Sequence, residues 1–429
     1  MITLSADLLA GRQEWEGSLP LLFRSMDDGD AYSTLGVKPA TITVPGQIYV
    51  GRRWFDCTPA ELARPQDVVL VMAQWPPPAP GPNPHSGDPV TQWIISGNLR
   101  RGSQWEAAPV ALVALREELY SPIAGLLESA VLAGKCVLVV GLGSGGAPIV
   151  LEFAKMGVDL ILVDHDRLEV HNLERHVGGL SEVGRRKTNV VSELVREKNP
   201  YANVAAYDFK LDASTREQAR SLIRRSDLVI GALDNNEGRL ILNRLCCEED
   251  KPLIIAGAFR RAYGGQVLVI RPHQTPCYQC FVKLMPEKVR EQEISSAEQA
   301  RRYAYSDRPV AIEPGLSVDI APISLMVAKL GLQLLLQGRA TTLRSLDEDL
   351  TAPWYLWLNR REPQTDYEKL DPLGCEVNGF HILRWYGIDY PRDPACPCCG
   401  DFNRNVAAAE GIQLGPADIA GFADSGVKT

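Results

Sequence analysis

The sequence predicts an α/β protein with a doubly wound sheet, and three observations carry that prediction. Apolar runs of strand length alternate with amphipathic, helix-length stretches from about residue 113 onward. The run "CVLVVG" (136–141) is rich in β-branched residues, which is typical of a strand buried on both faces. A glycine-rich turn, "GLGSGG", follows this strand directly and leads into a helical pattern.

Each later element has its own signal in the same region. Helices are predicted where apolar residues recur with helical spacing, and proline or glycine ends two of them, at Pro200 and Gly338. Strands are predicted where short apolar runs lie between turn residues. The expected helices are 146–157, 186–200, 236–250 and 320–338, and the expected strands are 136–141, 159–164, 226–234, 252–259 and 262–272.

The remaining sequence divides into an N-terminal and a C-terminal region. Residues 1–112 are expected to form an additional, β-containing domain of unassigned role, because the runs at 40–51 and 67–75 resemble strands. The proline-rich stretch Pro76–Pro84 between apolar runs predicts an exposed loop. We expect the α/β domain over residues 113–340 and a mixed, proline-containing segment over 341–429.

Composition excludes several classes of protein. The 429 residues include 23% charged and 45% hydrophobic residues, as in ordinary soluble globular proteins. A formal net charge of −8 argues against nucleic-acid binding. Because the sequence has neither a run of 18 apolar residues nor a signal peptide at Met1, we expect no membrane association and a cytoplasmic location.

The glycine-rich turn predicts a phosphate site. Gly141, Gly143 and Gly146 fit the G-x-G-x-x-G pattern of Rossmann-like folds, in which the backbone approaches a phosphate at the start of a helix. Asp164 ends the next strand, where a carboxylate can accept hydrogen bonds from ribose hydroxyls. On these features alone a dinucleotide fits at least as well as a mononucleotide, and a tight turn without a ligand is a third alternative.

Nearby polar residues favour a nucleoside triphosphate. Asn172, Arg175 and Lys187 can all donate hydrogen bonds to phosphate oxygens, and a dehydrogenase has no need of an asparagine and an arginine there. Asp234 and Asn235 end another predicted strand, at the sheet edge where ligands bind. Because a carboxylate beside phosphates is repulsive without a cation, Asp234 is predicted to bind Mg²⁺.

Two pairs of cysteines predict a metal site. Cys277 and Cys280 form one CxxC motif, and Cys396 and Cys399 form a second. Four thiolates make a closed, structural zinc site, which also suits a reducing compartment better than disulfides do. Cys398 lies inside the second motif and is an alternative ligand to Cys399.

The motifs, taken in order, resemble those of ubiquitin-activating-type adenylyltransferases. They are "GLGSGG", "VDHDRLEVHNLERH", "GRRK", "ALDNNEGRLILN" and "PCYQC", and the likeness is greatest to the molybdopterin-synthase and thiamine-biosynthesis adenylyltransferases. The resemblance covers about 113–340, which it identifies as an ATP-binding adenylation domain, and extends to the cysteine pair near 396. It implies binding of Mg-ATP and of the glycine-terminated tail of a ubiquitin-like or sulfur-carrier protein, whose carboxylate is adenylated.

The resemblance also implies roles for individual residues. Asp164 would hold the ribose, Asn172, Arg175 and Lys187 the phosphates, and Asp234 the magnesium. It further implies two distant cysteine pairs sharing one zinc ion, and a homodimer.

The sequence departs from the family pattern at two places. His176 stands where the family has glutamine. The family's N-terminal segment supplies an arginine to the partner's ATP site, but here that position holds Pro122, and Arg116 upstream is the candidate substitute.

The downstream pathway stays open between two alternatives. The N-terminal extension favours conjugation of a ubiquitin-like protein, because it offers a platform for a conjugating enzyme. Sulfur transfer to a cofactor or tRNA is the alternative. A nicotinamide-dependent oxidoreductase and an inactive scaffold are rival classes, and the set of phosphate-binding residues argues against both.

A thioester-forming cysteine is missing from its usual place. Family members that transfer their carrier as a thioester often keep a cysteine in the crossover loop, yet residues 281–320 contain none. Cys375 is the internal candidate nucleophile, since its glycine-containing flank suggests an accessible loop. An inert Cys375, with direct transfer of the acyl-adenylate to another protein's thiol, is the competing interpretation.

Overall fold

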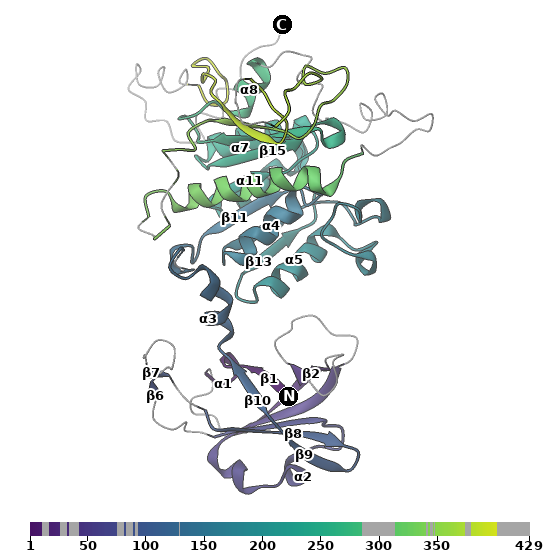
Figure 1. The fold of residues 1–429 in the computed structure, drawn as a ribbon. Coiled ribbons are helices and arrows are strands. Elements are labelled where there is room, and N and C mark those ends of the chain that lie inside the picture. The colour runs from purple at the N-terminus through teal and green to yellow at the C-terminus, as the bar shows by residue number, and fades with distance from the viewer. Residues whose placement is uncertain are drawn as a thin grey trace. The chain divides into compact units, whose positions relative to one another are not determined.

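The computed structural model of the chain has two compact units, Met1–Ala124 and Gly125–Thr429 (Figure 1). This boundary falls after the one expected at residue 112, because the strand β10 (Val110–Val113) pairs within the first unit and the short helices that follow it, over 115–123, are part of that unit. The structure describes residues 1–10, 17–25, 32–33, 43–74, 81–82, 89–90, 93–127, 129–284, 314–339, 342–343, 346, 348–373 and 379–400.

The first unit is built on one mixed sheet, in the order β10-β1-β3-β2-β4-β5-β8-β9. The two strands at the ends of this order, β9 and β10, are consecutive in the chain and separated only by Pro109. Ile2 N–H donates to Pro109 O (2.8 Å) at the junction. The sheet therefore curls round until its edges meet. Its strands are β1 (Ile2–Ser5), β2 (Gly17–Ser25), β3 (Tyr32–Ser33), β4 (Thr43–Val50), β5 (Val69–Ala73), β8 (Ile95–Arg101), β9 (Gln104–Ala108) and β10.

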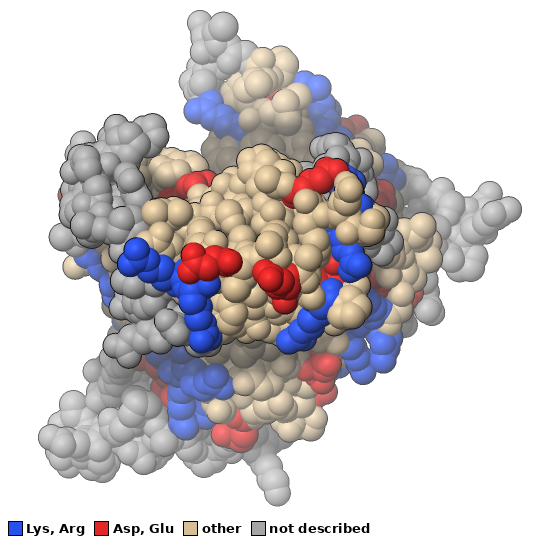
Figure 2. Space-filling view, turned by 90° about the horizontal axis from the view of Figure 1, so that it is seen from below, with Lys and Arg blue, Asp and Glu red and all other residues tan. Residues whose placement is uncertain are grey.

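The two faces of this curled sheet differ in burial. One face carries the unit's main core, with Ile2, Phe23 and Val71 fully buried. The other carries a small cluster in which Trp54 and Trp105 only partly cover the neighbouring strands. Figure 2 views the molecule from below and shows a largely uncharged surface, with basic side chains toward its margin and acidic ones beside them.

Short helices and a small hairpin complete the first unit. The hairpin of β6 (Gly81–Pro82) and β7 (Pro89–Val90) lies in and beyond the proline-rich stretch, most of which lies outside the described residues. The helices are α1 (Asp7–Ala10), η1 (Arg52–Asp56), α2 (Pro59–Leu62), α3 (Leu115–Tyr120) and η2 (Ser121–Ile123).

The second unit confirms the α/β prediction with a mixed sheet in the order β13-β12-β11-β14-β15-β16-β17-β18. The strands from β13 to β15 are parallel, and those from β15 to β18 are antiparallel. The strand order reverses between β11 and β14, which is the switch point where open α/β sheets bind ligands. The strands are β11 (Cys136–Val140), β12 (Asp159–Val163), β13 (Val204–Tyr207), β14 (Leu228–Gly231), β15 (Leu253–Ala258), β16 (Gly264–Ile270), β17 (Trp354–Leu358) and β18 (Arg384–Ile388).

Helices cover both faces of this sheet, as a doubly wound fold requires (Figure 1). Leu138 of β11 shares a core with Leu222 of α6 and Leu242 of α7, while α4, α5 and α11 pack together on the other face. The 3₁₀ turns are η3 (Ser129–Val131), η4 (Val170–Asn172), η5 (Leu180–Glu182), η6 (Ala213–Thr215) and η7 (Arg260–Ala262). The helices are α4 (Gly146–Lys155), α5 (Lys187–Lys198), α6 (Arg216–Arg224), α7 (Asn236–Glu248), α8 (Tyr278–Leu284) and α11 (Ser317–Leu336).

The helix α11 is long and rich in apolar residues. Among the described residues it alone has the length and composition to span a membrane, but 56% of its most apolar window is buried. It packs against α4, β15 and β16. A Cβ at Gly331 would meet the Phe153 ring at 2.7 Å, so the helix approaches α4 closely. Its apolar character is accounted for by burial in the unit's core.

The C-terminal region contributes to the same sheet. The strands β17 and β18 extend it beyond β16, with Leu356 and Leu358 buried in its core. They bring the second cysteine pair into the second unit.

Candidate functional site

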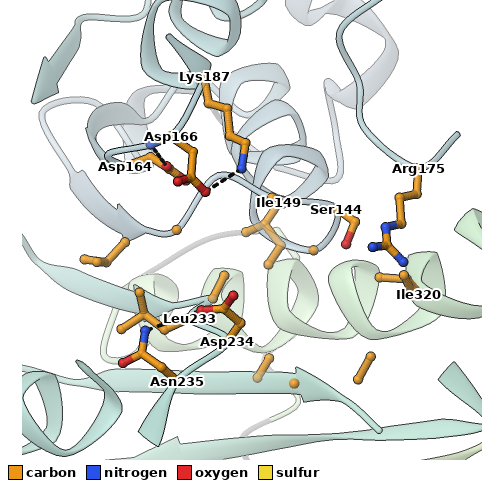
Figure 3. Close-up of a pocket in the computed structure, with 18 of the residues that line it drawn as sticks. Ser144, Ile149, Asp164, Asp166, Arg175, Lys187, Leu233, Asp234, Asn235 and Ile320 are labelled. Atoms are coloured by element: carbon orange, nitrogen blue, oxygen red, sulfur yellow. Dashed lines mark hydrogen bonds and ion pairs between the residues drawn. The ribbon is translucent and has the colours of Figure 1, made fainter. Parts of the chain in front are cut away.

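A cavity of about 410 Å³ opens at the switch point between β11 and β14 (Figure 3). This volume lies within the range of roughly 300–1,000 Å³ that is usual for small-molecule sites. Its walls come from the carboxyl ends of five parallel strands, β11 to β15, from the segments that follow them, and from the start of α11. Lining residues that argue for a ligand are Gly141, Gly143, Ser144, Gly145, Asp164, Asp166, Asn172, Arg175, Lys187, Lys210, Asp234, Asn235 and Ser324.

Glycine stands at the three motif positions for different physical reasons. Gly141 has φ +94°, and a Cβ there would lie 2.4 Å from Ala232 O. A Cβ at Gly146 would lie 1.9 Å from Gly141 O, so both positions need glycine for packing. A Cβ at Gly143 would meet nothing within 4 Å, and this residue lines the cavity. Glycine at 143 therefore leaves space for something other than the protein.

The start of α4 faces the same cavity. Its N-cap residue is Gly145, and no side chain caps the helix. Ser324 of α11 donates its hydroxyl to Gly145 O (2.9 Å) and so ties the loop to the core helix. Uncapped N–H groups at a helix N-terminus favour an anionic ligand.

Asp164 is held rigidly at the end of β12. Its Oδ2 accepts from Leu142 N–H (2.6 Å), and its Oδ1 accepts from Asp166 N–H (2.7 Å). Each carboxylate oxygen has a second lone pair, so hydroxyl donors can still bind. The buried Asp164 is therefore pre-oriented at the cavity wall.

Lys187, the first residue of α5, is paired with Asp166. Its ammonium lies 2.8 Å from Asp166 Oδ2, as Figure 3 shows. Partial burial raises the pKa of Asp166, but the hydrogen bond and charge of Lys187 outweigh burial and leave that pKa below its usual value. An ammonium has three donors, so this pair leaves donors for a second anion.

Asn172 and Arg175 approach from the segment after β12. Glu169 N–H donates to Asn172 Oδ1 (3.0 Å), which identifies Nδ2 as the amide's donor end. Arg175 is half-buried, and a Cβ on Gly315 would lie 3.6 Å from its Nη1. Figure 3 shows its side chain entering the cavity near Ser144 and Ile320. Two further donors for anionic groups thus line the same cavity.

Asp234 and Asn235 lie on the opposite side of the switch point, after β14. Asn235 caps α7 by accepting from Gly238 N–H (2.7 Å), and its Nδ2 donates to Asp234 Oδ1 (3.3 Å). Arg239 is buried and donates to Leu233 O (3.0 Å), which secures the segment before Asp234. The exposed Asp234 carboxylate faces the cavity and is a hard oxygen donor of the kind that Mg²⁺ prefers.

The structure thus brings most of the predicted site residues together. Eight of them line the cavity, and Gly146 lies directly behind it. Cys375 lies outside the described residues, and Arg116 lies on α3 of the first unit. The eight are Gly141, Gly143, Asp164, Asn172, Arg175, Lys187, Asp234 and Asn235.

Sequence reasoning missed other residues of the cavity. Ser144 lies inside the glycine motif and Asp166 in "VDHD", two motifs that the sequence already marks, yet the sequence alone gives neither residue a role. Ser324 and Lys210 reach the cavity only through tertiary packing, and no local signal marks them.

The four cysteines of the CxxC motifs form one buried cluster. Their Sγ atoms all lie within 4.8 Å of one another, and each residue is at most 4% exposed. The Sγ atoms of Cys277 and Cys280 lie 3.9 Å apart, those of Cys277 and Cys396 3.7 Å, and those of Cys280 and Cys399 3.5 Å. Thiolates placed tetrahedrally about 2.3 Å from zinc would lie about 3.8 Å apart. The cluster therefore fits one zinc ion.

The Cys398 side chain has contacts different from those of Cys396 and Cys399. Asn243 Nδ2 donates to Cys398 Sγ (3.1 Å), while Tyr278 N–H donates to Asn243 Oδ1 (2.9 Å). Asn243 of α7 thus bridges the two CxxC segments. The sulfur of Cys398 groups instead with those of Cys247 and Cys277. Cys399 is the geometrically favoured fourth ligand.

The second unit thus combines a phosphate-type loop, convergent cations and a four-cysteine cluster. A family match agrees with this combination. A profile of the ThiF family matches residues 119–360, more than half of the chain. The chain belongs to the ThiF family. This match confirms the family resemblance of its motifs.

Three curated proteins illustrate the relatives of this ThiF-family chain. "Adenylyltransferase and sulfurtransferase MOCS3" of Dictyostelium discoideum is 30% identical over 171 residues, 39% of this chain and 39% of that protein. "SAMP-activating enzyme E1" of Haloferax volcanii is 34% identical over 153 residues, 35% of this chain and 54% of that protein.

"Sulfur carrier protein ThiS adenylyltransferase" of Escherichia coli (strain K12) is 33% identical over 148 residues, 34% of this chain and 57% of that protein. The chain thus spans about two fifths to under three fifths of these relatives' length.

Proposed function

We propose that this chain uses Mg-ATP to adenylate the C-terminal glycine of a ubiquitin-like protein. The observation that carries the proposal is the cavity at the β11–β14 switch point. It joins the glycine loop, the cations Arg175 and Lys187, and the carboxylate Asp234. A triphosphate needs this combination of backbone donors, cations and a metal-binding acid.

The proposed reaction is a displacement at the α-phosphate of ATP. A carboxylate oxygen of the carrier's terminal glycine forms a bond to phosphorus. The bond from that phosphorus to the bridging oxygen breaks, and pyrophosphate leaves with the electron pair. Chemistry of this kind depends on positioning and charge neutralisation more than on a covalent protein group.

The chain's own residues would supply that positioning. The loop around Gly143 and the start of α4 would bind phosphate oxygens, and Arg175 and Lys187 would neutralise charge. Asp164 would accept hydrogen bonds from the ribose. Mg²⁺ bound at Asp234 would offset the charge of the leaving pyrophosphate.

Zinc would have a structural task away from the cavity. Bound by Cys277, Cys280, Cys396 and Cys399, it would link α8 to the segment after β18. A closed four-thiolate site leaves no open position for a substrate.

Two pathways after adenylation remain to be distinguished. The first unit, an additional 124 residues, supports conjugation because it can serve as a docking platform for a conjugating enzyme. Relatives named for sulfur carriers and sulfurtransferases support the alternative, activation of a sulfur-carrier protein. No cysteine lines the cavity among the described residues, which favours transfer to another protein's thiol unless Cys375 serves.

Pyrophosphate exchange tests the adenylation step. With Mg-ATP and a small protein ending in glycine, we expect labelled pyrophosphate to enter ATP, and we expect none with the carrier's last glycine removed. Asp234→Ala should lower exchange by about 10³-fold or more, because loss of the metal ligand costs several kcal/mol. Glu237→Ala is the matched control, because Glu237 is also an exposed acid, three residues away and outside the cavity.

Product analysis separates the pathways. A thiocarboxylate on the carrier, found by mass spectrometry after addition of a sulfur donor, would support sulfur transfer. A carrier linked through its terminal glycine to a lysine would support conjugation. Exchange that is unchanged in Asp234→Ala would refute the magnesium assignment, and NAD binding without ATP binding would refute the adenylation proposal.

A further inference from the structure

His176 is a buried histidine close to the glycine loop, and the proposed reaction assigns it no role. It is 9% exposed and follows Arg175 in the segment after β12. Its Nε2 lies 2.9 Å from Leu142 O, and Gly178 N–H donates to its Nδ1 at 2.9 Å. Both ring nitrogens are therefore engaged by backbone groups.

These two contacts determine the tautomer of the ring. A backbone N–H can only donate, so Nδ1 must be the unprotonated acceptor. The ring proton then lies on Nε2 and is donated to Leu142 O. A second proton on Nδ1 would face Gly178 N–H, donor against donor, and that hydrogen bond would break.

Leu142 connects this ring to the cavity. It lies between Gly141 and Gly143, its side chain is fully buried, and its N–H donates to Asp164 Oδ2 (2.6 Å). Its own N–H is thus held by Asp164 and its own C=O by His176. The neutral imidazole fixes one side of the loop that faces the cavity.

The charges around His176 come from two elements. Lys187, at the start of α5, opposes a second positive charge, and Asp164, at the end of β12, favours one. Gly178, which donates to the ring, is flanked by the apolar Leu168 and Val190. Burial is the largest influence on the pKa of His176 and lowers it, whereas the hydrogen bond to Leu142 O raises it. Together with Lys187, burial holds that pKa below its ordinary value.

The lowered pKa of His176 determines how the stability of the fold depends on pH. A histidine whose folded-state pKa is depressed stabilises the fold above its unfolded pKa of about 6.5, and that contribution is lost as pH falls through the folded pKa. The neutral ring is thus the form that belongs to the intact loop.

We propose that His176 is a positioning residue that holds the glycine loop in its ATP-binding geometry only while its ring is neutral. This inference rests on the proposed adenylation function. Protonation of Nδ1 would break the hydrogen bond from Gly178 N–H and force the ring away from it. Because the same ring holds Leu142 O, this movement would displace the loop and weaken ATP binding, while Arg175, Lys187 and Asp234 stay in place.

The test is the pH dependence of KM for ATP and of ATP affinity measured by calorimetry, between about pH 5.5 and 8. In the wild-type chain we expect KM to rise by about fivefold toward the acid end, within the limit of tenfold per pH unit for one proton. His176→Gln, whose amide has a donor and an acceptor but does not titrate, should flatten that rise to under about twofold. His273→Gln is the control, since Nε2 of His273 also contacts a backbone carbonyl (Cys247 O, 3.1 Å) but lies outside the cavity.

Several outcomes would overturn the proposal. One is an equal pH dependence in wild type and His176→Gln. Another is a dependence that vanishes in the double variant His165→Gln/His171→Gln, because those histidines also line the cavity. Absence of pyrophosphate exchange in the wild-type chain at every pH would instead refute the proposed function.

A measurement on the unmodified chain covers the case in which His176→Gln does not fold. Nitrogen NMR of histidine-labelled protein should show His176 protonated at Nε2 and unprotonated at Nδ1 at neutral pH. A ring protonated at Nδ1 at that pH would contradict the proposal.

Discussion

The cavity at the switch point and the cysteine cluster lie in the same unit but are built in opposite ways. The cavity's charged groups stand at the ends of parallel strands, where Asp234 and Asp166 remain open to solvent. The four cysteines are at most 4% exposed and come from segments more than 100 residues apart. A site that must exchange its ligand keeps polar groups at an opening, while a site that holds a metal permanently closes around it.

The largest effect is expected at the cysteine cluster, where one substitution would open the closed site and remove its difference from the cavity. Cys399→Ser should release zinc and lower the free energy of unfolding by about 4 kcal/mol, a fraction of the roughly 10–16 kcal/mol that structural zinc contributes in small zinc domains. Cys398→Ser, one residue away, should keep one zinc per chain because its sulfur faces Asn243. Metal analysis and thermal unfolding measure both variants. Zinc lost from Cys398→Ser but kept in Cys399→Ser would show that the ligand assignment is wrong.

An intermediate effect is expected at the cavity. Arg175→Ala should slow pyrophosphate exchange by raising its activation free energy by about 2–4 kcal/mol, the scale of one preorganised donor in a transition state. The unfolding midpoint should stay nearly unchanged. Arg167→Ala is a suitable control, since Arg167 is exposed, donates to Gly184 O and does not line the cavity. An equal loss of exchange in both variants would argue against a specific role for Arg175.

The smallest effects are expected within the glycine motif, where one glycine serves packing and another serves ligand approach. Gly146→Ala should destabilise the fold by roughly 1–3 kcal/mol, because its Cβ would collide with Gly141 O. Gly143→Ala should leave unfolding unchanged within about 0.5 kcal/mol and raise KM for ATP. Chemical denaturation and exchange kinetics separate the two effects. A destabilised Gly143→Ala variant with normal KM would mean that packing, not ligand approach, requires glycine at 143.

Family membership, the α/β class and the site residues near the glycine motif could all be read from the sequence. Each rests on a local pattern: a strand, the turn that follows it, and the polar residue at the strand's end. Because parallel strands of one sheet end at the same edge, Asp164 and Asp234 could be placed near one cavity without coordinates. The CxxC pairs were equally visible, since their spacing is local even though the pairs are distant.

Tertiary structure decided what depends on contacts between distant segments. The curled sheet of the first unit, the addition of β17 and β18 to the second, and the hydrogen bond from Ser324 to Gly145 have no local signature. The engagement of both nitrogens of His176 and the bridge that Asn243 forms between the cysteine segments are of the same kind. A sequence pattern reports which residues share a strand or turn, whereas the partner of a buried polar group is determined by which segments pack together.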